Sequence, residues 1–128
     1  MSEDYRNSIQ ENLKRGTTDM VILYLLSKED MYGYQLNQKI TELSKNRIVI
    51  KEGCLYPPVY RMESKGFLCK RKEFSPSGMV RNYFHITEAG REYLNTMIEE
   101  YKMLAAGIED IFTFRGVEED GANSAQEH

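Results

Sequence analysis

"EGCLYPPVYRMESKGF", residues 52–67, sets two adjacent prolines in front of a segment that otherwise has helical spacing. Proline lacks a backbone N–H, so it fits a regular helix only in the first turn, where the N–H groups have no intrahelical partner. The stretch therefore predicts a helix that begins near Cys54 or Leu55 and ends near Gly66. An earlier turn from Lys51, joined to this helix through a kink, is the alternative start.

Upstream of this stretch the sequence predicts three helices. A weak four-residue apolar repeat over residues 5–13 indicates the first one. Residues 20–26 are apolar nearly all round, so we expect them to lie in the central core helix, which Thr17 or Thr18 can cap. A turn leads into the third helix, which covers residues 33 to about 44.

Two strand-like segments follow the proline-led helix. "FLCKRKEF" (67–74) and "MVRNYFHI" (79–86) are separated by "SPSG" (75–78), which is rich in turn formers. Together they predict a β-hairpin with a flexible, basic tip. The short β-branched run "RIVI" (47–50) also predicts a brief strand, before the proline-led helix.

A long helix over residues 88–114, capped by Thr87, is the most regular pattern in the chain. Its apolar residues alternate in steps of three and four, as in a coiled coil, and are Leu94, Met97, Tyr101, Leu104, Ile108 and Ile111. Ile98, Ala105 and Phe112 widen this stripe. A chain this small has too little core to cover the stripe, so we expect a homodimer. Packing within one chain is the alternative.

This order of elements is typical of a winged helix-turn-helix, a mainly α fold of the α+β class. In that architecture the last helix of the trio enters the major groove of DNA, and the hairpin touches flanking backbone. We expect residues 1–87 to form the DNA-binding domain with its N-terminal helix. Residues 88–114 then form the dimerisation helix and residues 115–128 a disordered acidic tail.

The charge is distributed unevenly along the 128 residues, although the net charge is only −3. Residues 47–87 carry eight basic and three acidic side chains, whereas residues 88–128 carry three basic and ten acidic ones. A basic middle beside an acidic end favours an anionic partner for the middle segment. A solvated charged face is the alternative.

Composition limits the class of protein further. With 41% hydrophobic and 29% charged residues, the chain is typical of a soluble globular protein. The longest apolar run, residues 20–26, is too short to span a bilayer, and the N-terminus lacks the features of a signal peptide. We therefore expect no membrane partner. Cys54 and Cys69 do not lie in contexts where a disulfide would join loops, so we expect a cytoplasmic protein.

Three sequence blocks also resemble one known family. "MYGYQL" (31–36), "EGCLYPPVYRMESKGF" (52–67) and "RNYFHITEAGREYL" (81–94) occur in the order and spacing of the PadR family of bacterial transcriptional regulators. The resemblance covers roughly residues 13–100 and implies a small member that dimerises through its C-terminal helix. It implies a regulator of a pseudo-palindromic operator in double-stranded DNA, which we expect to be a repressor; an activator is the alternative. A winged-helix module for protein–protein contact is the alternative function.

Several segments offer side chains that could reach DNA. Arginine can pair with guanine, and tyrosine or lysine can reach phosphate; the resemblance adds backbone contacts from the third helix. The predicted DNA contacts are Tyr34, Gln35, Gln38, Lys51, Tyr56, Tyr60, Arg61, Lys65, Lys70, Lys72 and Arg81. The alternatives are that Tyr34 and Tyr56 belong to the core, and that Arg81 pairs with Glu73 across the hairpin.

The long helix raises the question of a small-molecule effector. The resemblance implies that Tyr101, in the middle of this helix, flanks a ligand cavity at the dimer interface, with Met97 one turn before it. Two Tyr101 side chains facing each other across a two-fold axis suit a small aromatic or hydrophobic molecule. The alternative is that Tyr101 only fills the interface.

Cysteine and histidine chemistry offers little else. Cys54 stands where the family usually has threonine, which puts one expected hydrogen bond in doubt and suggests a redox sensor as an alternative role. Cys54, Cys69 and His85 lack paired ligand spacing, so we expect no metal site. Since the sequence has no phosphate loop and no nucleophile–base pair, we expect neither a cofactor nor enzymatic activity.

Overall fold

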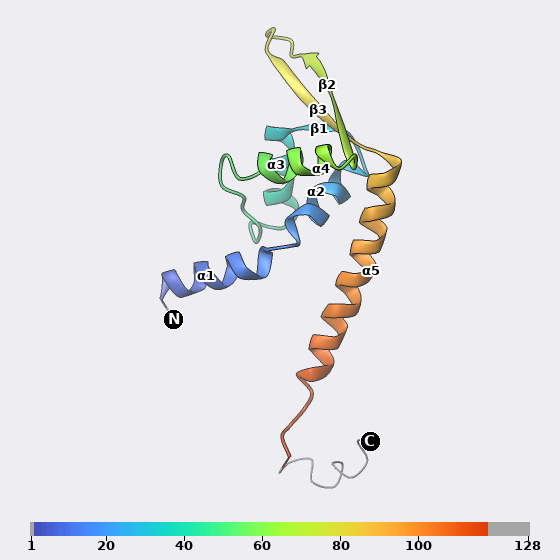
Figure 1. Ribbon diagram of the computed structural model, residues 1–128. Coiled ribbons are helices and arrows are strands. Elements are labelled where there is room, and N and C mark those ends of the chain that lie inside the picture. Colours follow the sequence, from blue (N-terminus) through green and yellow to red (C-terminus); the bar gives the residue numbers. More distant parts are fainter. Residues whose placement is uncertain (1, 118–128) are drawn as a thin grey trace. The chain divides into compact units, whose positions relative to one another are not determined.

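The computed structural model describes residues 2–117, and within them the chain forms five helices and three strands (Figure 1). In chain order these are α1 (Glu3–Lys14), α2 (Thr18–Leu26), β1 (Met31–Tyr32), α3 (Gly33–Leu43), α4 (Tyr56–Ser64), β2 (Leu68–Phe74), β3 (Val80–Ile86) and α5 (Glu88–Ile111). The arrangement is the predicted winged helix-turn-helix of the α+β class. The chain divides after Asn95 into two units, which are described separately.

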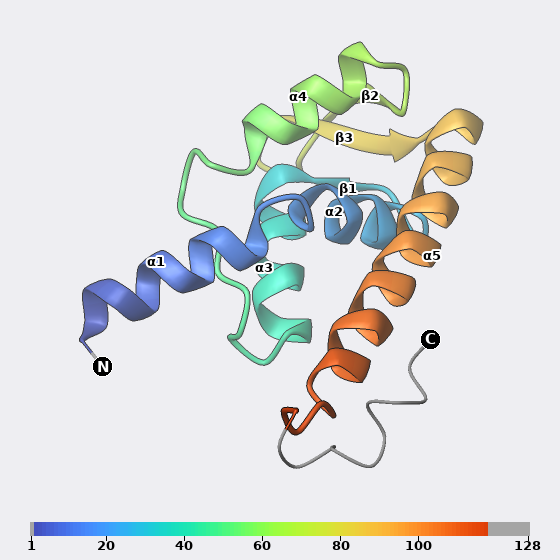
Figure 2. The same ribbon diagram turned by 60° about the horizontal axis from the view of Figure 1, so that its bottom comes forward.

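Helix α2 forms the centre of the first unit. It contacts α3, α4 and β3, and Figure 2 shows it among these elements. Its buried residues are Ile22, Leu23, Leu25 and Leu26. The neighbouring elements cover them with Leu36, Ile40, Val59, Met62, Phe84 and Ile86. The predicted central core helix is therefore confirmed, and its all-round apolar character follows from contact on several sides.

A three-stranded antiparallel sheet packs against these helices in the order β1-β3-β2. The hairpin register pairs Leu68 with Ile86 at its base and Phe74 with Val80 at its far end. The two residues of β1, Met31 and Tyr32, pair with β3 as well. The sequence pattern did not predict β1, because a two-residue strand has no periodicity of its own.

The strand predicted for residues 47–50 is wrong. This segment has no regular secondary structure, because side chains of α3 and its C-cap take up its backbone groups. Ile48 N donates to Ser44 Oγ at 2.9 Å, and Asn37 Nδ2 donates to Ile50 O at 3.2 Å. The β-branched run thus forms a connection that is tied to α3 and has no partner strand.

Helix α4 begins as the two prolines require. Leu55 is its N-cap residue and Pro57 and Pro58 lie in its first turn, so neither proline removes an intrahelical hydrogen bond. The helix ends at the C-cap Lys65, and Gly66 follows with φ +83°, a left-handed conformation that favours glycine. The predicted start and end are both confirmed.

The two predicted threonine caps differ in outcome. Thr87 Oγ1 accepts a hydrogen bond from Gly90 N at 3.0 Å, so it caps α5 as predicted. Thr17 is the N-cap residue of α2, but its side chain makes no capping bond. Its Oγ1 donates instead to Lys14 O, 2.7 Å away, which stabilises the turn after α1.

Helix α5 ends at Ile111, three residues before the predicted end of the dimerisation segment. The second unit begins at Thr96 and so contains the C-terminal part of this helix. Most of the predicted tail over residues 115–128 lies outside the described residues, which end at Val117. The domain boundaries given above stay a prediction.

Candidate nucleic-acid interface

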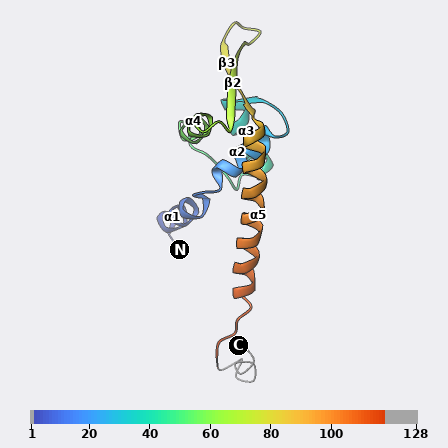
Figure 3. The same cartoon turned by 45° about the vertical axis from the view of Figure 1, so that its right-hand side comes forward.

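The β2–β3 hairpin stands out beyond the helices of the first unit (Figure 3) and has two different faces. Side chains alternate along each strand, and directly paired residues share a face. The inner face packs on the core through the buried Leu68, Phe84 and Ile86, and continues outward through Lys70, Lys72, Phe74, Val80 and Asn82. The outer face carries Cys69, Arg71, Glu73, Arg81, Tyr83 and His85.

Tyr60 of α4 connects the helix to the inner face of the hairpin. Its ring stacks on Tyr56 at a centroid distance of 5.8 Å and meets the edge of Phe84 at 6.4 Å. Lys70 Nζ lies 5.4 Å from the centroid of Tyr60 and 3.7 Å from Glu63 Oε1. Lys70 of β2 thus lies between an aromatic face and a carboxylate that both belong to α4.

A cavity of about 480 Å³ opens between the start of α3, α4 and the hairpin, and four tyrosines line it: Tyr32, Tyr34, Tyr56 and Tyr60. Arg81 and Asn82 line it from β3. A Cβ atom at Gly33 would overlap the hydroxyl of Tyr56 and lie 2.6 Å from Cζ of that ring. The missing side chain at Gly33 therefore lets Tyr56 lie against α3. The fold brings predicted contacts from three segments into one concave site.

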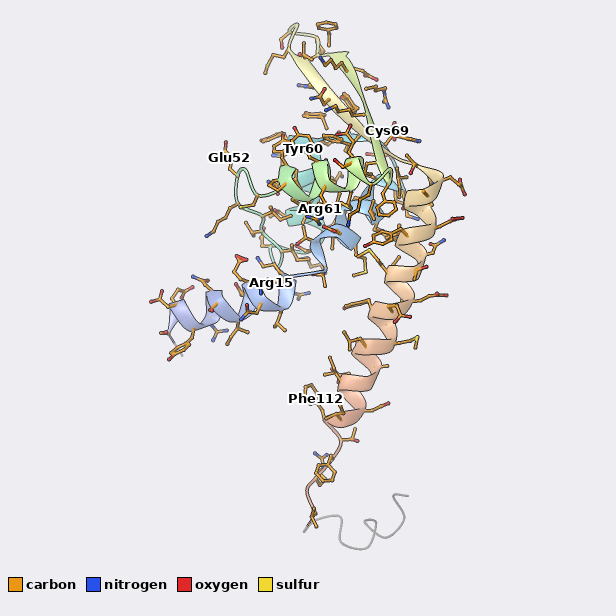
Figure 4. The ribbon with its side chains drawn as sticks, viewed as in Figure 1. Arg15, Glu52, Tyr60, Arg61, Cys69 and Phe112 are labelled. Atoms are coloured by element: carbon orange, nitrogen blue, oxygen red, sulfur yellow. The ribbon has the colours of Figure 1, made fainter. Side chains whose placement is uncertain are left out.

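Arg61 lies on a different side of α4 from Tyr60 (Figure 4). Its Nη2 atom lies 2.7 Å from Oδ1 and 2.5 Å from Oδ2 of Asp19 in α2. This charge-assisted pair ties α4 to the first turn of α2. Arg61 as a DNA contact stays a prediction, and the ion pair gives it a second role in positioning the helix.

Aromatic and cationic side chains alternate across the outer face of the sheet. The guanidinium of Arg81 lies 4.4 Å from the ring centroid of Tyr32, which meets Tyr83 edge to face at 5.3 Å. Arg71 lies 5.3 Å from the centroid of Tyr83, so Arg81, Tyr32, Tyr83 and Arg71 form one row, called the outer ladder below. Glu73 accepts a 2.6 Å hydrogen bond from Arg71 Nε, so the structure pairs Glu73 with Arg71 and not with Arg81.

Asp30 ends this outer ladder. Its Oδ1 lies 2.9 Å from His85 Nδ1, and its Oδ2 accepts a hydrogen bond from Arg71 Nη1. Burial raises the pKa of Asp30, but hydrogen bonds and charges from Arg71 and His85 outweigh it and leave the pKa below its usual value. Sequence reasoning missed Asp30, Tyr32 and Tyr83, because their contacts depend on the unpredicted strand β1.

The other predicted contacts are spread over the same unit. Gln38 Nε2 donates to the hydroxyl of Tyr34 at 2.8 Å, and Gln35 has a buried Oε1 with no partner in the described chain. Three predicted cations are exposed and form no ion pair within residues 2–117: Lys51, Lys65 and Lys72. These lysines differ from Lys70 and Arg61, whose charges are already paired.

Comparison with known families decides what this arrangement represents. The model of the transcriptional regulator PadR-like family matches residues 22–96, which is more than half of the chain. The chain belongs to the PadR-like family. Those residues of this PadR-like regulator run from α2 to the first turns of α5 and so contain α3, α4 and the whole hairpin. The resemblance seen in the three sequence blocks is confirmed.

Individual relatives are similar in sequence over 73% of this chain. An uncharacterised protein X of Lysinibacillus sphaericus is 32% identical over 93 residues, which cover 73% of this chain and 85% of the relative. The transcriptional regulator YqjI of Escherichia coli (strain K12) is 26% identical over 93 residues. That match covers 73% of this chain and 43% of YqjI, so it spans less than half of the length of that relative.

Solved structures share the fold. The PadR family transcriptional regulator from Eggerthella lenta superposes with a TM-score of 0.74 at 30% identity, covering 86% of this chain and 94% of that one. A transcriptional regulator from Clostridium thermocellum gives a TM-score of 0.72 at 30% identity, covering 77% and 96%. The PadR-like chain described here is therefore a transcriptional regulator with the winged-helix fold of its family.

The second unit of this PadR-like protein presents an apolar stripe along α5. Within the described chain, its larger members are between 42% and 70% exposed: Tyr101, Leu104, Ile108, Ile111 and Phe112. Met97 is half-buried, whereas Leu94, which belongs to the first unit, is buried. An uncovered apolar stripe of this length marks a surface that another molecule can cover.

Other kinds of site find little support in the PadR-like chain. Within residues 2–117, no group of three or more His, Cys, Asp or Glu side chains could hold a metal ion. No helix in this range is long and apolar enough to cross a membrane. Cys54 and Cys69 are free and exposed, and a redox role for Cys54 stays a prediction.

Proposed function

We propose that this PadR-like regulator is a homodimeric repressor that binds a pseudo-palindromic operator and is released by a small aromatic or hydrophobic effector. It would act in the cytoplasm, without catalysis. The observation that carries the proposal is the single surface formed by α4 and the inner face of the hairpin. On that surface the tyrosines of α4 lie beside Lys70, and β2 continues outward to Lys72.

The chemistry of this surface supports duplex DNA as the partner. Tyrosine hydroxyls and lysine ammonium groups suit phosphate oxygens, and a helix of the size of α4 fits the major groove. Lys65 at the end of α4 and Lys72 on the hairpin are exposed and carry no ion pair within residues 2–117, so each can release counterions from DNA. These side chains are the contacts we propose first.

Dimerisation is proposed from the apolar stripe of α5. Leu104 and Ile111 are each exposed to about two thirds or more, which is costly for aliphatic side chains on an isolated helix. A second copy of α5 would bury the same residues on both chains, as a two-fold interface requires. Two copies of α4 would then reach half-sites about one helical turn of DNA apart.

The effector proposal rests on Tyr101 and Met97. In a dimer formed through α5, two copies of each side chain would lie near the two-fold axis and enclose a flat aromatic slot. A ligand in this slot would change the distance between the two copies of α4, and so favour a state that binds the operator less well. No cofactor or metal is needed for this mechanism.

A gel-shift titration with the DNA upstream of the protein's own gene tests the function. We expect a complex at micromolar protein that weakens steeply with salt and is not formed by a shuffled duplex of equal composition. Lys72→Glu should weaken this complex, whereas Lys28→Glu, a lysine whose Nζ lies over the ring of Tyr24 in α2, makes the same charge change outside the proposed contacts and should not. No salt-sensitive, sequence-dependent complex would refute the proposal and favour a protein–protein module.

A further inference from the structure

The outer face of the sheet carries a second row of side chains beside the outer ladder. Cys69 on β2 pairs directly with His85 on β3. The register of β1 with β3 places Asp30, the residue before β1, next to His85 on its other side. Asp30, His85 and Cys69, called the thiol row below, thus bring a carboxylate, an imidazole and a thiol together from three segments of the chain.

The contact between Asp30 and His85 fixes which imidazole nitrogen is available. Asp30 Oδ1 lies 2.9 Å from His85 Nδ1, and a carboxylate only accepts hydrogen bonds, so Nδ1 carries the proton. The neutral ring then has its lone pair on Nε2. Asp30 is held in turn by Arg71, which donates to Oδ2 through Nη1. The carboxylate is therefore a positioning group that orients the imidazole as a base.

The thiol lies within reach of that base. Residues directly opposite each other in an antiparallel pair share a face, and their Cβ atoms are about 4.5–5.5 Å apart. Because Asp30 and Cys69 flank His85 on opposite sides, the ring can bind the carboxylate through Nδ1 and meet the sulfur through Nε2. A nucleophile beside a base that a third group orients is the arrangement that activates thiols.

The thiol row is open to small molecules. Cys69 is a free, exposed thiol near the base of the hairpin (Figure 4), and the side chain of His85 is 50% exposed. The core packs against the inner face of the hairpin, through Phe84 and Ile86, so the outer face leaves room for a reagent at the sulfur. An accessible thiol whose proton a neighbouring base can take is suited to covalent modification.

We propose that Cys69 is a reactive thiol, activated by His85 and Asp30, that α,β-unsaturated carbonyl compounds modify. His85 Nε2 takes the thiol proton, and the sulfur forms a bond to the β-carbon while the C=C π bond opens to an enolate. The imidazolium then returns the proton to the α-carbon. The adduct contains all the atoms of both reactants, so neither an oxidant nor a leaving group is involved. The site needs neither DNA nor a dimer and is independent of the proposed function.

The protein contains its own reference thiol for the test, since Cys54 is also free and exposed. The full-length protein is treated at pH 7 with acrylamide, a simple α,β-unsaturated carbonyl compound, and mass spectrometry of tryptic peptides gives the rate of adduct formation at each cysteine. Positioned bases accelerate reactions by about 10²–10⁴-fold within active sites, and solvent competes with an exposed base, so we expect Cys69 to react about tenfold faster than Cys54.

Three kinds of variant separate the parts of the thiol row. His85→Gln removes the base and should lower the ratio of the two rates to about one. Asp30→Asn should lower it as well, and Asp30→Glu, which keeps a carboxylate, should retain more of it than Asp30→Asn. Glu73→Gln removes a carboxylate from the same face but outside the row, and should leave Cys69 the faster thiol.

Equal rates at the two cysteines of the wild type overturn the proposal, and so does a ratio that folded His85→Gln leaves unchanged. Circular dichroism and the melting temperature confirm that each variant is folded. A second measurement needs no variant: wild-type protein unfolded in urea has lost the strand pairing that forms the thiol row, so its ratio should fall toward one. A ratio that persists in urea comes from neighbouring residues in the sequence, and the proposal is then wrong.

Discussion

Gly90 is the position where packing and helix propensity oppose each other most directly. It is buried in the first turn of α5, and an added Cβ would overlap the carbonyl oxygen of Phe67 and lie 2.8 Å from Cγ1 of Ile86. That carbonyl cannot move freely, because it accepts a 3.0 Å hydrogen bond from Thr87 N. The start of α5 would have to shift away from the strand, and the stacking of Phe67 on Tyr93 at 4.2 Å would weaken with it.

Gly90→Ala should therefore destabilise the protein although it adds a good helix former. Helix propensity alone favours alanine over glycine by about 1 kcal/mol. Overpacking against neighbours that cannot yield costs about 1–3 kcal/mol or more, and lost ring stacking adds about 0.5–1.5 kcal/mol. We expect a net loss of about 2 kcal/mol in the free energy of unfolding, which lowers Tm by roughly 8–16 °C in a unit of this size.

Gly107→Ala is the matched control on the same helix, since a Cβ at Gly107 meets nothing within 4 Å. Propensity is then unopposed, and stability should rise by up to about 1 kcal/mol. Thermal melts followed by circular dichroism, at one fixed protein concentration, give both values. A Tm for Gly90→Ala equal to or above that of the wild type would refute the packing argument, whatever the control does.

Three further outcomes follow from the ion pairs and the helix stripe. Arg61→Gln and Asp19→Asn should each lower the free energy of unfolding by about 1 kcal/mol and show less than additive loss together in chemical denaturation. The pKa of Asp30 is lower in the folded protein than in the unfolded chain, because Arg71 and His85 stabilise the charged carboxylate. The charged carboxylate therefore stabilises the fold above the unfolded pKa of about 3.9, and this stabilisation is lost as the pH falls through the folded pKa. Asp30→Asn should therefore lower Tm at pH 6 more than at pH 3. Ile108→Glu should convert a dimer to a monomer in analytical ultracentrifugation, with little change in the melting of the first unit.

The parts of the fold that were predicted correctly are those set by local chemistry. The two prolines fix the start of α4 because only a first turn tolerates them, and Gly66 fixes its end. Thr87 caps α5 because its hydroxyl lies three residues before the orphan N–H of Gly90. Each of these helix ends depends on a few neighbouring residues, so the sequence alone is enough to predict it.

The wrong or missed parts depend on contacts between distant segments. Residues 47–50 have the composition of a strand, but Ser44 and Asn37 compete for their backbone groups. Strand β1 exists only because β3 lies beside it. Asp19 binds Arg61 from 42 positions away, and no local pattern connects the two residues. The structure brings four of the predicted DNA contacts to one cavity, but the sequence did not show which of the charged residues form ion pairs with each other.

The pairing of charges changes how the basic middle segment should act on DNA. Arg61, Lys70 and Arg71 each already bind a carboxylate, so a phosphate can gain them only by displacing that carboxylate. Such an exchange replaces one anion by another and releases fewer counterions than a free cation does. Lys65 and Lys72 face no such competitor within residues 2–117. The attraction for DNA should therefore come from fewer cations than the sequence contains, while the paired ones hold α4 and the hairpin in position for the groove.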